Sequence, residues 1–149
     1  MPTRGRRIGL VGCVREKALT GCAARDLYLS HLFVGRRAFV EASCTEWWIL
    51  SAKHGLVDPK EHLRPYNVTL KTKGRGDRRK WSQRVLAQID ERIRPGTGDV
   101  FEVHAGAEYR DFGLVVDGRI LGCRVENLTA GMGIGKQLRF YKGARERRV

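Results

Sequence analysis

The sequence predicts an α/β fold, a three-layer sandwich with a central, mostly parallel sheet. Apolar runs of strand length, such as residues 8–14 and 47–50, alternate with longer segments whose apolar residues recur at helical spacing, such as 81–93. A chain of 149 residues is long enough for one core of ordinary size. We therefore expect a single α/β domain over 1–149.

The first half of the chain is expected to place a helical region between two strands. The first strand is predicted at 8–14 and the second at 47–50. Between them, apolar residues recur near helical spacing over 24–43, and Gly35 predicts a break between two helices.

The second half is expected to continue the same alternation. Two glycines make the basic segment 71–80 a predicted mobile loop, and Arg94-Pro95-Gly96 ends the amphipathic helix at 81–93. The other predicted elements are an extended stretch at 67–70, a strand at 99–105, a helix that begins within 109–114, a strand at 122–127 and a glycine-punctuated turn that opens a helix at 131–141.

The charge of the chain points to a polyanionic partner. The net charge is +13 and the isoelectric point is near 10.3, an excess that folding does not require. Nucleic acid is favoured over an anionic membrane, because no amphipathic helix combines a lysine-rich face with an aromatic one. Basic residues gather in an N-terminal arm (1–7), in segment 71–80 and in a C-terminal tail (142–149). The predicted contacts to the nucleic-acid backbone are Lys71, Lys73, Arg75, Arg78, Arg79, Lys80, Lys136 and Arg139.

The sequence also limits compartment and chemistry. The apolar stretch after the basic start is short and contains Gly12, and no segment has transmembrane length, so a cytoplasmic monomer is expected. The four cysteines are Cys13, Cys22, Cys44 and Cys123. They form no Cys-x-x-Cys pair, so we expect free thiols, no metal site and no cofactor.

Polar residues follow two of the predicted strands at their carboxyl ends. Ser51, Lys53 and His54 come directly after the strand at 47–50, and His104 stands at the corresponding place before Gly106. Open α/β sheets build sites beyond the carboxyl ends of their strands, which predicts one shared pocket. The alternative interpretation is a solvated turn after each strand, without chemistry.

Several phrases together resemble a family of small bacterial and phage domains that is similar to the uracil-DNA glycosylase superfamily. They are Val11-Gly12-Cys13 with Lys17, residues 24–30 with Leu32-Phe33, residues 49–56, Pro65-Tyr66-Asn67 and Gly133-Ile134-Gly135. The resemblance implies a uracil-DNA-glycosylase-like fold. It also implies an enzyme that flips a modified base out of double-stranded DNA and excises it, leaving an abasic site. Among glycosylases, the nearest likeness is to antiphage enzymes that remove glucosylated hydroxymethylcytosine.

The resemblance also implies roles for particular residues. Asp26, or alternatively Glu16, would supply the catalytic carboxylate, and His104 would donate to the departing base. The superfamily's Asp-Pro-Tyr and His-Pro-Ser phrases are absent at these two places. The expected substrate-binding residues are Cys13, Lys17, Arg25, Ser51, Lys53, His54, Tyr66, Asn67 and Tyr109.

Two other functions remain open. The Cys13 and Lys17 pair, followed by Tyr28 and Ser30, resembles the lysine-centred motif of archaeosine synthase, in which an amine attacks a nitrile on a deazaguanine base. The other function is noncatalytic nucleic-acid binding. The turn at 131–135 lacks the spacing of a nucleotide-triphosphate loop, but its backbone amides could hold a nucleic-acid phosphate.

Overall fold

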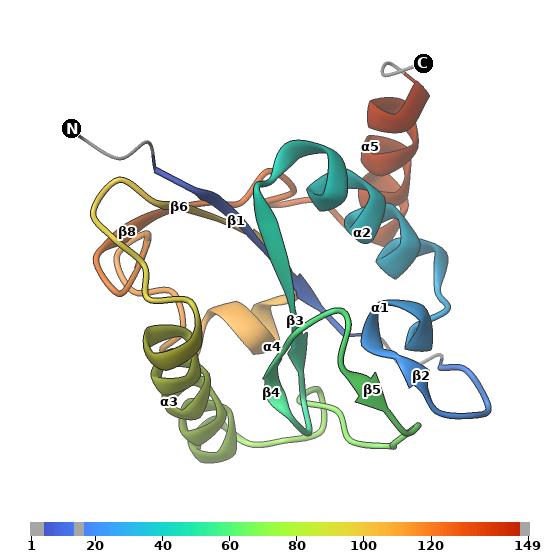
Figure 1. The fold of residues 1–149 in the computed structure, drawn as a ribbon, viewed down its shortest axis with the longest axis horizontal. Coiled ribbons are helices and arrows are strands. Elements are labelled where there is room, and N and C mark those ends of the chain that lie inside the picture. The colour runs from blue at the N-terminus through green and yellow to red at the C-terminus, as the bar shows by residue number, and fades with distance from the viewer. Residues whose placement is uncertain (1–4, 14–16, 147–149) are drawn as a thin grey trace.

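The computed structural model describes residues 5–13 and 17–146, and its centre is a mostly parallel six-stranded sheet (Figure 1). The strand order is β4-β3-β1-β6-β8-β7. The four inner strands, which are parallel, are β3 (Glu46–Ser51), β1 (Arg7–Gly12), β6 (Val100–His104) and β8 (Cys123–Glu126). The antiparallel edge strands are β4 (Gly55–Val57) and β7 (Arg119–Ile120). The predicted α/β class with a mostly parallel sheet is confirmed.

Helices cover both faces of the sheet (Figure 1). The pair on one face is α2 (His31–Ser43) and α5 (Ile134–Glu146), and the pair on the other is α3 (Arg75–Arg92) and α4 (Ala107–Arg110). A small antiparallel pair of β2 (Cys22–Ala23) and β5 (His62–Leu63) stands beside the short helix α1 (Ala24–Leu27). None of the helices in the described ranges combines the length and the apolar character needed to cross a membrane.

Gly35 does not break the helical region, contrary to the prediction. Helix α2 runs through it, and the break lies at residues 28–30, where the Ser30 hydroxyl accepts a hydrogen bond from the Phe33 amide at 3.1 Å. A Cβ atom at Gly35 would lie 2.9 Å from the Cβ of Tyr141. The glycine therefore serves close packing of α2 against α5.

The basic segment 71–80 is mostly helical rather than a mobile loop. Helix α3 begins at Arg75, six residues before the predicted helix start at Trp81, and the Arg78 amide donates to the Gly74 carbonyl at 3.0 Å. The face that carries Trp81, Val85 and Ile89 is buried against the sheet, as the apolar spacing predicts. The basic side chains of the first two turns are therefore presented by a helix.

A buried polar network joins the sheet to α2 and α5. The His104 ring lies 2.7 Å from Glu102 through Nε2 and 2.7 Å from the Tyr141 hydroxyl through Nδ1, and Phe39 packs on it with ring centroids 5.2 Å apart. Arg7 donates to Glu102 and to Glu126. Burial alone would raise the pKa of Glu102, but hydrogen bonds from His104 and Arg7 outweigh it and lower this pKa.

The first described basic residues of the chain also serve the fold. Arg6 pairs with Asp99 at 2.9 Å and with Glu46 at 2.8 Å, and Arg7 is the first residue of β1. Residues 1–4 of the predicted arm lie outside the described ranges. Two cations of the basic N-terminal arm are therefore engaged within the protein.

Candidate functional site

The main cavity lies where the sheet topology places a ligand site. From β1 the chain passes through α2 to β3 on one side, and later through α3 to β6 on the other, so β1 and β6 flank the switch point. A cavity of about 780 Å³ opens there, within the size range of small-molecule sites. The ends of the two strands approach closely, since a Cβ atom at Gly12 would lie 2.8 Å from the Cβ of Ala105.

The cavity combines apolar and polar surface and is strongly cationic. The polar and titratable residues that line it are Cys13, Lys17, Arg36, Asn67, Thr69, Lys71, Thr72, Lys73, Glu108, Tyr109 and Gln137. Within the described part of the lining, four side chains are cations and one, Glu108, is a carboxylate. Such a lining favours an anionic ligand and gives Glu108 a distinct chemical role.

The Glu108 carboxylate is held at the carboxyl end of β6. A Cβ atom at Gly106 would lie 2.6 Å from both of its oxygens, so the carboxylate folds back over this glycine. Gly106 directly precedes α4, and Gly106 and Glu108 both line the cavity. The absence of a side chain at Gly106 leaves room for the carboxylate beside the strand exit.

Lys17 lies against an aromatic wall. Its Nζ is 4.5 Å from the ring centroid of Tyr66 and 5.8 Å from that of Tyr28. Burial lowers the pKa of this lysine, although the nearby Cys13 acts in the opposite direction. At a given pH, the Lys17 amine is therefore uncharged in a larger fraction of the molecules than an exposed lysine would be.

A chain of hydroxyl groups stands behind this wall. The Tyr66 hydroxyl is bonded to Ser51 Oγ at 2.7 Å and to the Tyr28 hydroxyl. Ser51 is fully buried. Its Oγ accepts a hydrogen bond from the His54 amide at 3.0 Å, and its backbone carbonyl accepts one from the Trp81 indole N–H at 2.9 Å. These contacts fix the plane of the Tyr66 ring that Lys17 faces.

Cys13 and Tyr109 form another part of the lining. The Cys13 sulfur and the Tyr109 hydroxyl are 3.0 Å apart, and the Tyr109 ring packs edge-on against Trp81 with centroids 5.2 Å apart. The Cys13 amide donates to the Leu50 carbonyl at 2.9 Å, which continues the β1–β3 pairing past the strand end. Cys13 is thus held at the point where β1 leaves the sheet.

The structure brings together only part of the predicted site. Cys13, Lys17, Asn67 and Tyr109 line the cavity, and so do Lys71 and Lys73. Tyr66 faces Lys17, while Ser51 and His54 stand behind Tyr66, where the His54 ring meets the tyrosine edge-on at 5.3 Å. Lys53 is exposed, with its Nζ 6.0 Å from the Tyr66 centroid.

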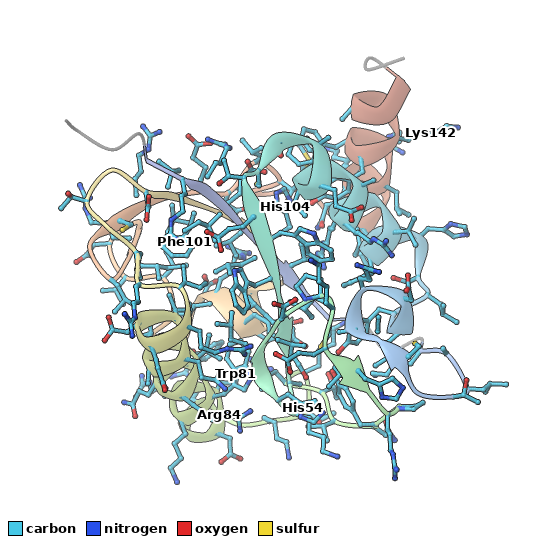
Figure 2. All side chains as sticks on the ribbon, viewed as in Figure 1. His54, Trp81, Arg84, Phe101, His104 and Lys142 are labelled. Carbon is cyan, nitrogen blue, oxygen red and sulfur yellow. The ribbon has the colours of Figure 1, made fainter. Side chains whose placement is uncertain are left out.

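The predicted catalytic residues are not among those that line the cavity. Asp26 is on the surface, where it pairs with Arg37 at 2.9 Å and lies 3.8 Å from Arg25. His104 is fully buried beneath α2 and α5, and Figure 2 shows it well apart from His54. Glu16 lies outside the described residues. His54 and His104 therefore do not share a pocket: His54 lies in the turn between β3 and β4 against Tyr66, whereas His104 ends β6 and is buried against Glu102 and Tyr141.

Sequence reasoning missed Arg36, Glu108 and Gln137. Glu108 follows a strand exit, so the rule that selected His104 could have selected it too. Arg36 lies three residues after Phe33 and four before Val40, which are both buried, and a charged residue on the buried face of a helix was the available signal. Gln137 has no local signal.

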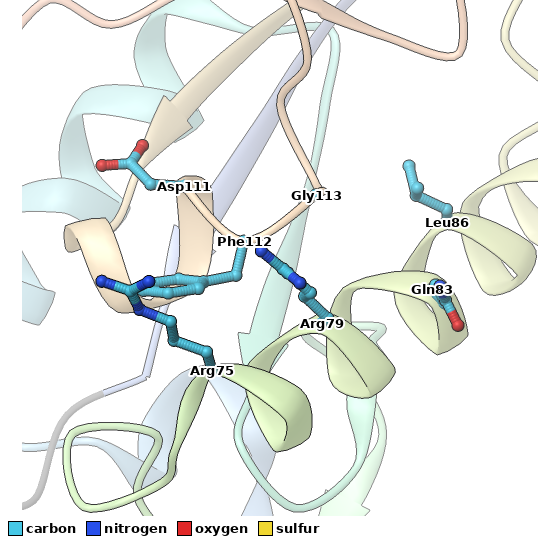
Figure 3. A pocket seen from close by; sticks show the side chains of 7 residues that line it. All are labelled: Arg75, Arg79, Gln83, Leu86, Asp111, Phe112 and Gly113. Atoms are coloured by element: carbon cyan, nitrogen blue, oxygen red, sulfur yellow. The ribbon is translucent and has the colours of Figure 1, made fainter.

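A second depression runs along α3 (Figure 3). Its volume is about 660 Å³, and Arg75 and Arg79 face Phe112 across it. The guanidinium of Arg78 lies 4.8 Å from the centroid of the Phe112 ring. Lys80 is exposed on the same helix, whereas Lys136 and Arg139 are exposed on α5. The predicted backbone contacts are thus divided among the cavity, this groove and α5.

Alkaline pH is expected to destabilise the folded protein. The four tyrosines of the chain are Tyr28, Tyr66, Tyr109 and Tyr141. Burial raises the pKa of each in the folded state, so the unfolded chain releases these protons first, from a pKa of about 10. The free energy of unfolding should therefore fall as the pH rises above about 10. Tyrosinate absorbance and circular dichroism should change together in one step, and tyrosinate formation with the circular dichroism unchanged would contradict this.

The fold and the cavity define an α/β protein with a cationic cavity at the switch point of its sheet. Within the described residues, no group of three or more histidine, cysteine, aspartate or glutamate side chains could hold a metal ion. A family model for DUF6884, a family of unknown function, matches residues 8–143, and the chain belongs to this family. No curated protein and no solved structure matches the chain.

Proposed function

We propose that this protein is a DNA glycosylase with a uracil-DNA-glycosylase-like arrangement, which flips a modified base into the cavity and excises it. The observation that carries the proposal is the cavity at the β1/β6 switch point, where, among the described residues, one carboxylate stands with four cationic side chains. Together with a net charge of +13, this lining suits a nucleotide within a polyanion.

The chemistry assigns a role to the carboxylate. When the glycosidic bond breaks, its electron pair leaves with the base and the sugar carbon becomes cationic. Glu108 is the described carboxylate of the cavity, and in this proposal it stabilises that cation or takes a proton from the attacking water. Water supplies the new bond to the sugar carbon, and the base gains a proton. The product is an abasic site.

The aromatic and amide groups of the cavity suit an extruded base. Tyr109 and Asn67 line it, and Tyr66 stands behind Lys17. An amide can bond the edge of a base, and aromatic rings can contact its face. The cavity volume of about 780 Å³ lies in the upper part of the range for small-molecule sites, which leaves space for a substituent such as the sugar of glucosylated hydroxymethylcytosine.

The direct test is a search for abasic sites after incubation with DNA. Duplexes with unmodified, hydroxymethylated and glucosylated cytosine, together with phage DNA, are incubated with the protein and then treated with alkali. Cleavage at modified positions is the expected result. Strands that remain intact for the whole panel would reject the glycosylase proposal, and salt-sensitive binding in the same samples would then favour a noncatalytic nucleic-acid-binding module.

Two lysines of the cavity are expected to contribute to the salt dependence of DNA binding. Each of Lys71 and Lys73 should release counterions when it meets a phosphate, so the double change Lys71→Gln, Lys73→Gln should reduce the slope of log K against log salt by about 2. Fluorescence anisotropy at several salt concentrations measures this. Lys60→Gln, which replaces an exposed lysine that does not line the cavity, is the matched control and should leave the slope unchanged. Equal slopes for the wild type and the double variant would place the DNA backbone elsewhere.

A second candidate function is favoured by Lys17. Its lowered pKa and its place in the cavity suit a nucleophilic amine, as in the lysine-dependent modification of a deazaguanine nitrile. The amine would add to the nitrile carbon, with its proton moving to the nitrile nitrogen, and no group would leave. Mass spectrometry after incubation with such a nitrile should then show an adduct on Lys17 that Lys17→Met cannot form. Abasic sites without an adduct would select the glycosylase.

A further inference from the structure

One cation of the cavity has an unsatisfied buried donor. Arg36 has only 6% of its surface exposed, and its Nε has no hydrogen-bond partner among the described residues. Burial lowers the pKa of Arg36, with Tyr141 and Glu108 acting in the opposite direction, yet a guanidinium remains protonated at any ordinary pH. A buried charge with an unpaired N–H is costly unless a ligand satisfies it.

The Arg36 guanidinium is held against the first turn of α5. It donates through Nη2 to the Gln137 carboxamide oxygen at 3.1 Å, and the Gln137 amide nitrogen donates to the Met132 carbonyl at 3.0 Å. Arg36, Gln137 and Ile134 all line the cavity. The buried cation and the start of this helix therefore face the same space.

The start of α5 is itself suited to an anion. Helix α5 has 13 residues, and its first turn contains no acidic residue. The first amides of a helix have no partner within it, and the helix dipole places partial positive charge there. The only basic residue of this turn, Lys136, adds to the positive charge.

We propose that Arg36 and the first turn of α5 form a subsite for a phosphate group of the bound nucleotide. The subsite rests on the proposed function only in placing a nucleotide in this cavity. Among the described lining residues, Glu108 is the acidic group and Lys17, Arg36, Lys71 and Lys73 are the cations, so positive charge predominates. A phosphate oxygen that accepts from Arg36 Nε would satisfy the buried donor through a charge-assisted hydrogen bond.

The subsite can be tested by binding measurements without DNA and without turnover. Inorganic phosphate, thymidine 5′-monophosphate and thymidine are titrated into the protein by calorimetry. Phosphate and the monophosphate are expected to bind, and thymidine to bind at least roughly tenfold more weakly than the monophosphate. Binding of the monophosphate alone would mean that the base also contributes, whereas equal binding of phosphate and monophosphate would mean recognition of the phosphate group by itself. Either result supports the subsite.

Two variants separate the subsite from effects on folding. Arg36→Met should weaken phosphate binding by roughly tenfold or more, while Arg64→Met, which replaces an exposed arginine that lines neither the cavity nor the groove along α3, should not change it. Because Arg36 is buried, a second variant leaves it in place. Ile134 is 62% exposed, so Ile134→Glu is tolerated sterically and adds a carboxylate to the first turn of α5. It should keep or raise the Tm, because acidic residues suit a helix start, and it should abolish phosphate binding. Ile134→Gln is the matched neutral control.

The outcomes are decisive for the subsite alone. The proposal is overturned if the folded wild-type protein binds neither phosphate nor the monophosphate, or if Ile134→Glu binds them as the wild type does. Phosphate binding without any base excision would support the subsite and reject the glycosylase. Base excision without phosphate binding would support the glycosylase and reject the subsite.

Discussion

Replacement of Glu102 by alanine is expected to lower the free energy of unfolding by about 3–5 kcal/mol, the cost of removing one partner from a buried charge pair. The carboxylate is fully buried and receives hydrogen bonds from Arg7 and His104. Without it, the His104 ring loses its Nε2 partner and Arg7 keeps only Glu126. Urea unfolding followed by tryptophan fluorescence measures the difference.

The pH dependence of this effect has a definite sign. The pKa of Glu102 is lowered in the folded state, so its contribution is present above the unfolded glutamate pKa of about 4.3 and is lost as the pH falls through the folded pKa. The difference in stability between the wild type and Glu102→Ala should therefore shrink in acid. Glu41→Ala is the control, because Glu41 forms an exposed pair with Arg37 on α2 and should cost less than about 1 kcal/mol. Equal losses for the two variants would show that the buried network does not stabilise the fold.

The second large effect is expected at Glu108. If the protein is a glycosylase, Glu108→Gln should slow the formation of abasic sites by about 10²- to 10⁴-fold, the usual contribution of a positioned acid or base. Single-turnover cleavage of a modified duplex measures the rate. Glu41→Gln, on the exposed side of α2, controls for the loss of one negative charge and should keep the wild-type rate.

The same assay compares Glu108 with Asp26, the carboxylate expected from the sequence. Asp26 is on the surface and bound to Arg37, which places it apart from the cavity lining. Asp26→Asn should therefore slow the reaction far less than Glu108→Gln. The opposite order would contradict the role of Glu108 and would require α1 to move toward the substrate. Thermal melting of both variants establishes that the comparison is between folded proteins.

The main parallel strands and the core of α3 could be predicted from local patterns. Strand-length apolar runs gave the positions of β1, β3 and β6, and the apolar spacing at Trp81, Val85 and Ile89 gave the core of α3. The early start of α3 was missed because Gly74 and Gly76 dominate the local composition there, whereas the helix is held by packing of its later turns. Gly35 was misinterpreted because a glycine is needed there for close packing against Tyr141, which lies 106 residues away in the sequence.

The candidate site could be predicted in part, including where it follows a strand exit. Cys13 and Tyr109 were found because they lie beside the ends of β1 and β6. The direction of a side chain at such an end is set by tertiary packing, and for this reason His104 was placed in a pocket although it lies under α2 and α5. Arg36 comes from the middle of a helix. Its place in the cavity depends on its contact with Gln137 of α5, which no local pattern in α2 reveals.

The two outer strands of the sheet have a consequence for self-association. Strand β4 has three residues and β7 has two, and both run antiparallel to their inner neighbours. Long exposed edges invite another chain to add a strand, but edges this short offer few unpaired backbone groups. With a net charge of +13 on every copy, mutual repulsion acts in the same direction. The sheet is thus protected against edge-to-edge aggregation by its geometry and by the charge of the chain.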